Sequence, residues 1–206
     1  MKKNLWPGKF IVLEGLDGSG LTTQAKLLKN FLEKKGIKTI LTKEPTKNSS
    51  VSKEIQEILG HKKEIDPFNF QRLFAKDRDE HLKKEIIPAL KKGIWVISDR
   101  YFFSSFAYGA EDKPEIQKII DLNKNFLLPD LTILLKVDPE ICMERIKKRQ
   151  EEIKLFEKKE KLEKVWQNYC HLLEIFDNIK VVNGKNSIEK VFQEITKLVR
   201  SKFNLN

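Results

Sequence analysis

The sequence has few cysteines and no long hydrophobic stretch, and each absence excludes a class of protein. Cys142 and Cys170 are the two cysteines among 206 residues, and neither belongs to a C-x-x-C pair or a Cys/His cluster. A disulfide framework and a zinc site are therefore not expected. No apolar run approaches the roughly 20 residues that span a bilayer, and residues 1–9 lack the apolar core of a signal peptide. We expect a cytoplasmic protein with no membrane partner.

Acidic residues are outnumbered by basic ones, with 30 Asp and Glu against 40 Lys and Arg and a formal net charge of +10. A basic balance is typical of proteins that bind nucleic acids. Most lysines, however, alternate with glutamates, as in residues 151–163, which is the pattern of a solvated helical face. A basic surface also attracts polyanionic small molecules such as nucleotides. We therefore expect no nucleic-acid partner.

One lysine is missing from a motif that normally requires it. Residues 15–23 read GLDGSGLTT, which matches the phosphate-binding loop G-x-x-x-x-G-K-[ST] except that Leu21 replaces the lysine. Thr22 retains the hydroxyl that ligates Mg²⁺, whereas the cation that reaches the β- and γ-phosphates is absent. The candidate ATP-binding residues are Gly15, Leu16, Asp17, Gly18, Ser19, Gly20, Leu21, Thr22 and Thr23.

The segments around this loop favour a phosphate site over a glycine-rich turn without a ligand. Residues 10–13 form an apolar run typical of a strand that is covered on both faces. After the loop, Ala25, Leu28 and Leu32 repeat at helical spacing. A phosphate-binding loop lies between a strand and a helix because backbone N–H groups and the helix N-terminus then face the anion.

Strand-like and helix-like segments alternate along the chain, without a linker or an internal repeat. This pattern predicts an α/β fold with a mostly parallel sheet and helices on both faces, in a single domain over residues 1–206. Ligands of such sheets bind at the C-terminal ends of the strands. The five expected strands are Lys9–Glu14, Ile37–Leu41, Ile94–Ser98, Leu131–Val137 and Ile179–Asn183.

Three helix starts are also predicted. Asp66 and Asp138 each precede a proline, and an N-cap carboxylate before a proline at the first helical position is a common helix start. Asn186 forms a capping-box-like pair with Glu189 and is expected to start the last helix.

Polar residues directly after the third expected strand form a second candidate site. Asp99 is suited to hold Mg²⁺, and Arg100 can bind a phosphate through its bidentate guanidinium. A structural Asp–Arg pair is the alternative for these two residues alone. Phe74 and Arg78 are four residues apart on an expected helix, so a ring and a guanidinium share one face and could bind a base.

Together these residues resemble the thymidylate kinase family over essentially the whole chain. The matching segments are residues 10–23, 42–46, 73–78 with His81, 99–108 and 144–149. The resemblance implies a P-loop kinase fold with a five-stranded parallel sheet and a short lid, Mg²⁺-dependent phosphoryl transfer from ATP to dTMP, and a homodimer.

The resemblance also implies individual roles. Phe74 would stack on thymine, Arg78 would donate to the base, and Tyr108 would lie against the deoxyribose. Arg100 would hold the acceptor phosphate, and Asp17 would organise the phosphates, Mg²⁺ and Arg100. Thr22 and Asp99 are the metal candidates. The candidate substrate-binding residues are Glu44, Pro45, Phe74, Arg78, Arg100, Ser104, Ser105 and Tyr108.

Residues 144–157 resemble the mobile lid of this family, in which an extra arginine sits in the phosphate-binding loop or in the lid. Gly18 occupies the loop position, so Arg145 and Arg149 are the lid candidates. The candidate catalytic residues are therefore Asp17, Arg100, Arg145 and Arg149.

The chain departs from the family pattern at two positions: Gly109 replaces a glutamine and Leu21 replaces the lysine. Three interpretations remain open. The protein is an active kinase in which Arg145, Arg149 or Lys43 supplies the missing charge, a nucleotide-binding protein with little turnover, or a kinase for another deoxynucleoside monophosphate.

Overall fold

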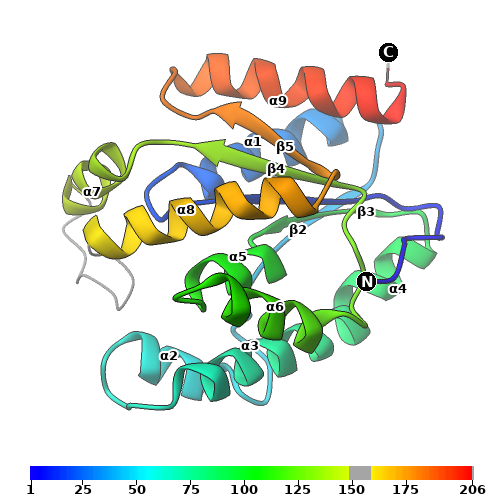
Figure 1. The fold of residues 1–206 in the computed structure, drawn as a ribbon. Helices are drawn as coiled ribbons and strands as arrows, with labels where there is room; N and C mark the ends of the chain where they lie inside the picture. The colour runs from blue at the N-terminus through cyan, green and yellow to red at the C-terminus, as the bar shows by residue number, and fades with distance from the viewer. Residues whose placement is uncertain (149–158, 206) are drawn as a thin grey trace.

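The computed structural model describes residues 1–148 and 159–205, and within these ranges five strands form one sheet (Figure 1). The strand order is β2-β3-β1-β4-β5, and every neighbouring pair is parallel. The strands are β1 (Phe10–Gly15), β2 (Thr39–Lys43), β3 (Trp95–Asp99), β4 (Leu131–Lys136) and β5 (Ile179–Asn183). The predicted five-stranded parallel sheet is thereby confirmed.

Helices cover both faces of this sheet. Their bounds are α1 (Leu21–Lys34), α2 (Ser52–Leu59), α3 (Pro67–His81), the π-helix η1 (Leu82–Ile86), α4 (Ile87–Lys91), α5 (Phe102–Tyr108), α6 (Lys113–Asn123), α7 (Pro139–Lys148), α8 (Lys159–Ile175) and α9 (Ile188–Phe203). In Figure 1, α1 and α9 lie on one side of the sheet and α5 and α8 on the other. The helices α2, α3 and α6 lie beyond α5, farther from the sheet.

The two faces have separate apolar cores because successive side chains of a strand point in opposite directions. On β1, Phe10 and Val12 pack with the helices on the α5 and α8 side. Ile11 and Leu13 pack on the opposite face, with α1 and α9. All four side chains are fully buried, which explains why this strand reads as an unbroken apolar run.

The second strand lies two residues later than the predicted Ile37–Leu41. Residues 36 and 37 end helix α1 instead, since the N–H of Gly36 donates to the carbonyl of Glu33 and that of Ile37 to the carbonyl of Leu32. At the other end, pairing with β3 continues until Lys43 lies opposite Asp99. Lys43 is therefore the last residue of a strand rather than part of the following loop.

The start of α3 is as predicted, whereas that of α9 is one residue later than expected. Asp66 caps α3, with its Oδ1 accepting from the N–H of Asn69 at 2.9 Å. For α9 the cap is Ser187, whose hydroxyl accepts from the N–H of Lys190. The Asn186 side chain donates instead to Glu194, about two turns along the helix. Ser187 has the three-residue spacing that an N-cap requires.

The C-terminal ends of the strands place the candidate residues at one edge of the sheet. The phosphate-binding loop connects β1 to α1, and Asp99 and Lys43 end the neighbouring strands β3 and β2. In Figure 1 the arrowheads of β4 and β5 point toward α7, which lies at the same edge. Among the described helices, none is both long and apolar enough to cross a lipid bilayer.

Candidate active site

The loop between β1 and α1 encloses a cavity of about 340 Å³. Eight of the nine predicted ATP-binding residues line it, and Gly15 is the exception. The carbonyl of Gly15 instead accepts from Nη1 of Arg100 at 2.9 Å. The cavity is otherwise lined by Lys43, Asp99, Arg100 and Arg145. The wall is thus formed by loop backbone and charged side chains, as a polyphosphate site requires.

Gly18 cannot be replaced by a residue with a side chain in this arrangement. Its φ is +84°, and a Cβ atom would lie 2.6 Å from the backbone oxygen of Cys142 on α7. An arginine at position 18 would therefore collide with α7. Packing of α7 against the loop explains why any additional arginine of this site must come from elsewhere.

Thr22 and Asp99 meet at the floor of the cavity. The Thr22 hydroxyl donates to Oδ2 of Asp99 at 2.5 Å, and Oδ1 of Asp99 is buried without a hydrogen-bond partner among the described residues. Mg²⁺ prefers such oxygen ligands and is usually held by one or two carboxylates together with substrate phosphates and water. In the described ranges no cluster of three or more His, Cys, Asp or Glu side chains forms a metal cage. The residues present fit a magnesium ion that is bound together with a nucleotide.

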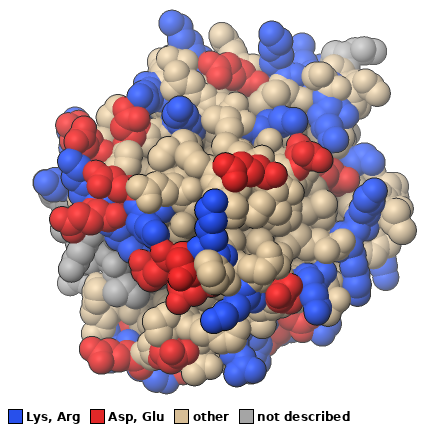
Figure 2. All heavy atoms as spheres, in the orientation of Figure 1, with Lys and Arg blue, Asp and Glu red and all other residues tan. Residues whose placement is uncertain are grey.

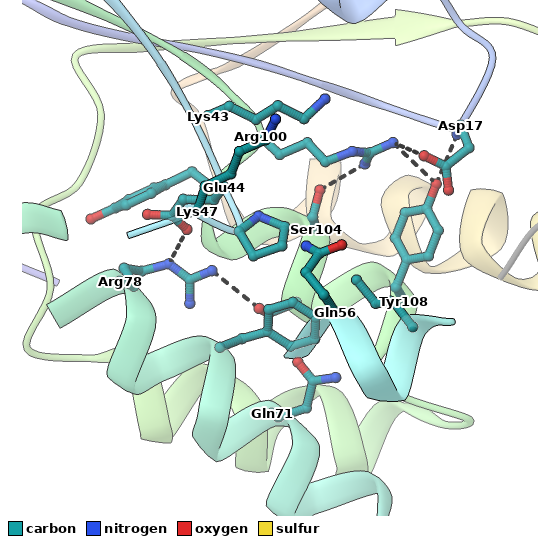
Figure 3. A pocket seen from close by; sticks show the side chains of 15 residues that line it. Asp17, Lys43, Glu44, Lys47, Gln56, Gln71, Arg78, Arg100, Ser104 and Tyr108 are labelled. Carbon is teal, nitrogen blue, oxygen red and sulfur yellow. Dashed lines mark hydrogen bonds and ion pairs between the residues drawn. The ribbon is translucent and has the colours of Figure 1, made fainter. Parts of the chain in front are cut away.

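A second cavity, of about 280 Å³, adjoins the first (Figure 3). All eight predicted substrate-binding residues line it, and they come from the β2 exit, α3, the β3 exit and α5. The remaining lining residues are Asp17, Lys43, Lys47, Gln56, Leu59, Gln71 and Tyr101. The cavity combines an aromatic ring, Phe74, with several guanidinium, amide and hydroxyl groups.

Arg100 connects the phosphate-binding loop to α5. Its Nη2 binds Oδ1 of Asp17 at 2.7 Å, and its Nη1 binds the Ser104 hydroxyl at 2.9 Å (Figure 3). Its guanidinium also lies over the ring of Tyr108, whose hydroxyl accepts from the N–H of Asp17. Arg100 has a φ of 75°, a left-handed conformation that is uncommon outside glycine. The predicted association of Asp17 with Arg100 is present in the geometry.

Arg78 is held in one orientation by three buried partners. Its Nε binds Glu44 at 2.8 Å, its Nη1 binds Asn123 at 2.7 Å and its Nη2 binds Ser105 at 3.2 Å. The Arg78 side chain is 2% exposed and that of Glu44 is 4% exposed. The sequence indicated Arg78 as a base donor, but it did not indicate the ion pair that fixes its guanidinium at the cavity wall.

Gln71 is a lining residue that the sequence did not single out. Its side chain is buried, its Oε1 has no hydrogen-bond partner among the described residues, and in Figure 3 its carboxamide points into the cavity. A Cβ atom at Gly109 would lie 2.4 Å from Cδ of Gln71. The glycine at position 109 therefore leaves the space that the Gln71 side chain fills. The only sequence signal was the departure at Gly109 itself.

Glu14 is a second residue that the sequence analysis missed, although a carboxylate in an apolar strand is itself a signal. It accepts hydrogen bonds from the N–H of Tyr101 and from the hydroxyls of Ser104 and Tyr169. Burial raises the pKa of Glu14 to about 7, although the nearby Arg100 charge and these hydrogen bonds act in the opposite direction. Glu14 thereby joins β1 to the start of α5 and to α8.

Of the two predicted lid arginines, Arg145 lies within the described residues and Arg149 does not. Arg145 on α7 lines the loop cavity, and its guanidinium lies 3.4 to 3.5 Å from the carbonyl oxygens of Gly18, Ser19 and Gly184. Arg149 and most of the predicted lid, residues 144–157, lie outside the described residues. Arg145 therefore lies beside the loop backbone.

Three charged side chains line both cavities: Asp17, Lys43 and Arg100. The phosphate-binding loop and the cavity around Phe74 therefore share one polar wall. A phosphoryl group that passes from a ligand in one cavity to a ligand in the other must pass beside these three side chains. Two adjoining cavities with common charged residues suit the transfer of a phosphoryl group between two bound molecules better than the binding of a single ligand.

Comparison with known proteins gives one consistent result. A family model described as thymidylate kinase matches residues 13–195. A probable thymidylate kinase of Thermococcus gammatolerans is 42% identical over 93% of this chain and 96% of its own length. One of Pyrococcus horikoshii is 43% identical over 94% of this chain and 96% of its own. A thymidylate kinase of Carboxydothermus hydrogenoformans is 37% identical over 91% and 95%. With a match of this extent, the chain belongs to the thymidylate kinase family.

Proposed function

We propose that this protein transfers the γ-phosphoryl group of ATP to dTMP, giving dTDP and ADP, in a Mg²⁺-dependent reaction. The observation that carries the proposal is the pair of adjoining cavities with the shared wall of Asp17, Lys43 and Arg100. ATP would occupy the loop cavity and dTMP the cavity around Phe74. Phosphoryl transfer depends on positioning and charge stabilisation, so charged side chains between the two ligands are what the reaction needs.

In the acceptor cavity, a pyrimidine with a carbonyl edge fits the available groups. Phe74 would stack on the base, and the immobilised Arg78 and Ser105 would donate to a base carbonyl. The Oε1 of Gln71, which has no partner within residues 1–148 and 159–205, is an acceptor, and the N3–H of thymine is a donor. Tyr108 would pack against the deoxyribose, and Arg100 would hold the acceptor phosphate.

In the donor cavity, Thr22 and Asp99 would hold Mg²⁺, which would neutralise phosphate charge. Arg145 and Arg149 are the lid cations that we propose to contribute when the lid closes over the donor phosphates. The family resemblance also supports a cytoplasmic location and a homodimer. Sedimentation of the purified protein would test the homodimer.

The experiment is an assay of ADP release with ATP and Mg²⁺ against a panel of nucleoside monophosphates. We expect turnover with dTMP above that with the other acceptors. Saturable dTMP binding without turnover of any acceptor would contradict the proposal and favour a nucleotide-binding protein. Turnover that is faster with another deoxynucleoside monophosphate would favour a kinase of different specificity.

A further inference from the structure

The donor cavity lacks a positive charge at the position where its loop motif calls for one. Leu21 is the first residue of α1, and its side chain is 5% exposed and packs in the apolar core between the sheet, α1 and α9. Leu21 therefore supplies no charge to a phosphate in the loop cavity, although it is one of the residues that line it. A phosphoryl-transfer site built on this loop must obtain the charge from another element.

Three cations line the donor cavity in the part of the chain that the structure describes: Lys43, Arg100 and Arg145. Arg100 is bound to Asp17, Ser104 and the carbonyl of Gly15. Arg145 is directed at loop carbonyls and does not line the acceptor cavity. Lys43 lines both cavities, so its side chain lies where a phosphoryl group in transit must pass.

The position of Lys43 follows from the sheet register. Lys43 ends β2 directly opposite Asp99, which ends β3. Its Nζ lies 3.0 Å from Oδ2 of Asp99, and the same oxygen accepts from the hydroxyl of Thr22. The ammonium group is therefore beside the residue that follows Leu21. In Figure 3 the side chains of Lys43 and Arg100 extend in the same direction, toward Asp17.

Lys43 also has the freedom that a phosphate-binding lysine needs. Its side chain is 57% exposed, whereas that of its partner Asp99 is 4% exposed. The ammonium can therefore turn from the fixed carboxylate to a phosphate by rotation about its flexible four-carbon stem. When the ammonium turns away, Oδ2 of the buried Asp99 keeps its hydrogen bond from the Thr22 hydroxyl.

We propose that Lys43 replaces the missing loop lysine and binds the phosphate oxygens of a nucleoside triphosphate from the end of β2. The inference rests on the proposed function, because it assigns a residue to the donor site of that reaction. Lys43 forms no covalent bond in this role. Its charge stabilises the negative charge on the transferring phosphoryl group, as the loop lysine would.

The test compares Lys43→Met with Lys38→Met. Lys38 is exposed and lies just before the first residue of β2, so the control removes the same charge at the opposite end of the strand from the site. We expect Lys43→Met to lower kcat about 100-fold or more, since the loss of one preorganised contact to a developing charge has effects of this size. Its affinity for a non-hydrolysable ATP analogue should fall about tenfold, and more than its affinity for ADP, because the lost contact includes the γ-phosphate. Lys38→Met should match the parent in both measurements.

A second variant separates a direct role from an indirect one through Asp99. Leu21→Lys in the Lys43→Met background returns a cation to the loop. We expect the kcat of this double variant to be about tenfold or more above that of Lys43→Met alone. If Lys43 merely holds Asp99 in place, a lysine at position 21 restores nothing and the ATP to ADP affinity ratio stays at the parent value. That combination would overturn the proposal, as would a kcat for Lys43→Met within about threefold of the parent.

The outcome also distinguishes the two proposals of this site. A parent protein that turns over dTMP while Lys43→Met is unaffected leaves the kinase function standing and refutes the role of Lys43. A parent without turnover refutes the kinase function, and the ATP analogue still tests Lys43 by binding alone. If Arg145→Ala, and not Lys43→Met, lowers both kcat and the affinity for the ATP analogue, the charge comes from the lid and the inference about Lys43 is wrong.

Discussion

At the scale of single residues, the buried carboxyl group of Glu14 gives a specific pH dependence. Its pKa is raised to about 7 by burial, so the folded protein keeps a proton that the unfolded chain releases near pH 4.5. Unfolding then releases a proton between these values, and the free energy of unfolding falls as the pH rises through this window. The decrease from this group is at most about 3.5 kcal/mol, because a tenfold change in a proton-binding constant corresponds to about 1.4 kcal/mol.

Glu14→Gln should remove this dependence, because the amide does not titrate, and its oxygen can still accept from the N–H of Tyr101. Urea unfolding from pH 5 to pH 7.5 should show a smaller loss of stability in the variant than in the parent. Glu64→Gln, a change at an exposed position, is the control and should follow the parent. Parallel profiles of parent and Glu14→Gln would contradict the assignment.

Gly109 and Gln71 form a complementary pair whose interaction can be measured. A Cβ atom at Gly109 would lie 2.4 Å from Gln71 Cδ and 2.6 Å from the Ser105 carbonyl oxygen. Gly109→Ala should therefore destabilise the protein by roughly 1 to 3 kcal/mol, the usual cost of overpacking. In the double variant with Gln71→Ala part of that loss should return, since the shorter side chain leaves room. Thermal unfolding of the four proteins measures the coupling, and additive losses would rule out the contact.

At the scale of elements, the β-strands and the phosphate-binding loop were predictable because their signals are local. The apolar run at residues 10–13 and the loop glycines specify their own backbone, and β5 lies at the predicted Ile179–Asn183. The start of β2 was not predictable in this way, because hydrogen bonds that end α1 use Gly36 and Ile37. Partners distant in sequence, such as Arg78 with Asn123, depend on how α3 packs against α6 and leave no local trace.

The attachment of α3 to the β2 exit should respond to pH through His81. The buried imidazole binds Glu44 through Nδ1 and faces Thr42 and Glu85 through Nε2, and Asp77 adds a further negative charge nearby. Burial alone lowers the pKa of His81, but the hydrogen bond and charge of Glu44, with the other carboxylates, raise it above 6.5. The stabilising contribution is therefore complete below pH 6.5 and is lost as the pH rises through the folded-state value.

His81→Gln should be less stable than the parent at pH 6 and closer to it at pH 9. Glutamine can keep one hydrogen bond to Glu44 but carries no charge in either state. Equilibrium unfolding at the two pH values is the measurement, with His171→Gln as control because that histidine is on α8, away from α3. A stability difference that is the same at both pH values would show that the charge of His81 contributes nothing.

At the scale of the whole molecule, charges of opposite sign lie near one another on the face that Figure 2 shows. Lys and Arg lie among Asp and Glu across this face, in agreement with the interleaved sequence pattern. The two cavities, in contrast, share Lys43 and Arg100 with a single carboxylate, Asp17. Two nucleotides bound there would place their phosphates against the same two cations.

This sharing predicts that binding of the two nucleotides is coupled. Without Mg²⁺, dTMP and a non-hydrolysable ATP analogue should together raise the unfolding temperature by less than the sum of their separate effects, since like charges at close range repel. Mg²⁺ held by Thr22 and Asp99 would neutralise part of that charge, so the combined shift should approach the sum when the metal is present. Thermal unfolding with each ligand alone and with both, at fixed ionic strength, measures the coupling. Additive shifts in the absence of Mg²⁺ would mean that the cavities act independently and that their common wall of Asp17, Lys43 and Arg100 does not connect them electrostatically.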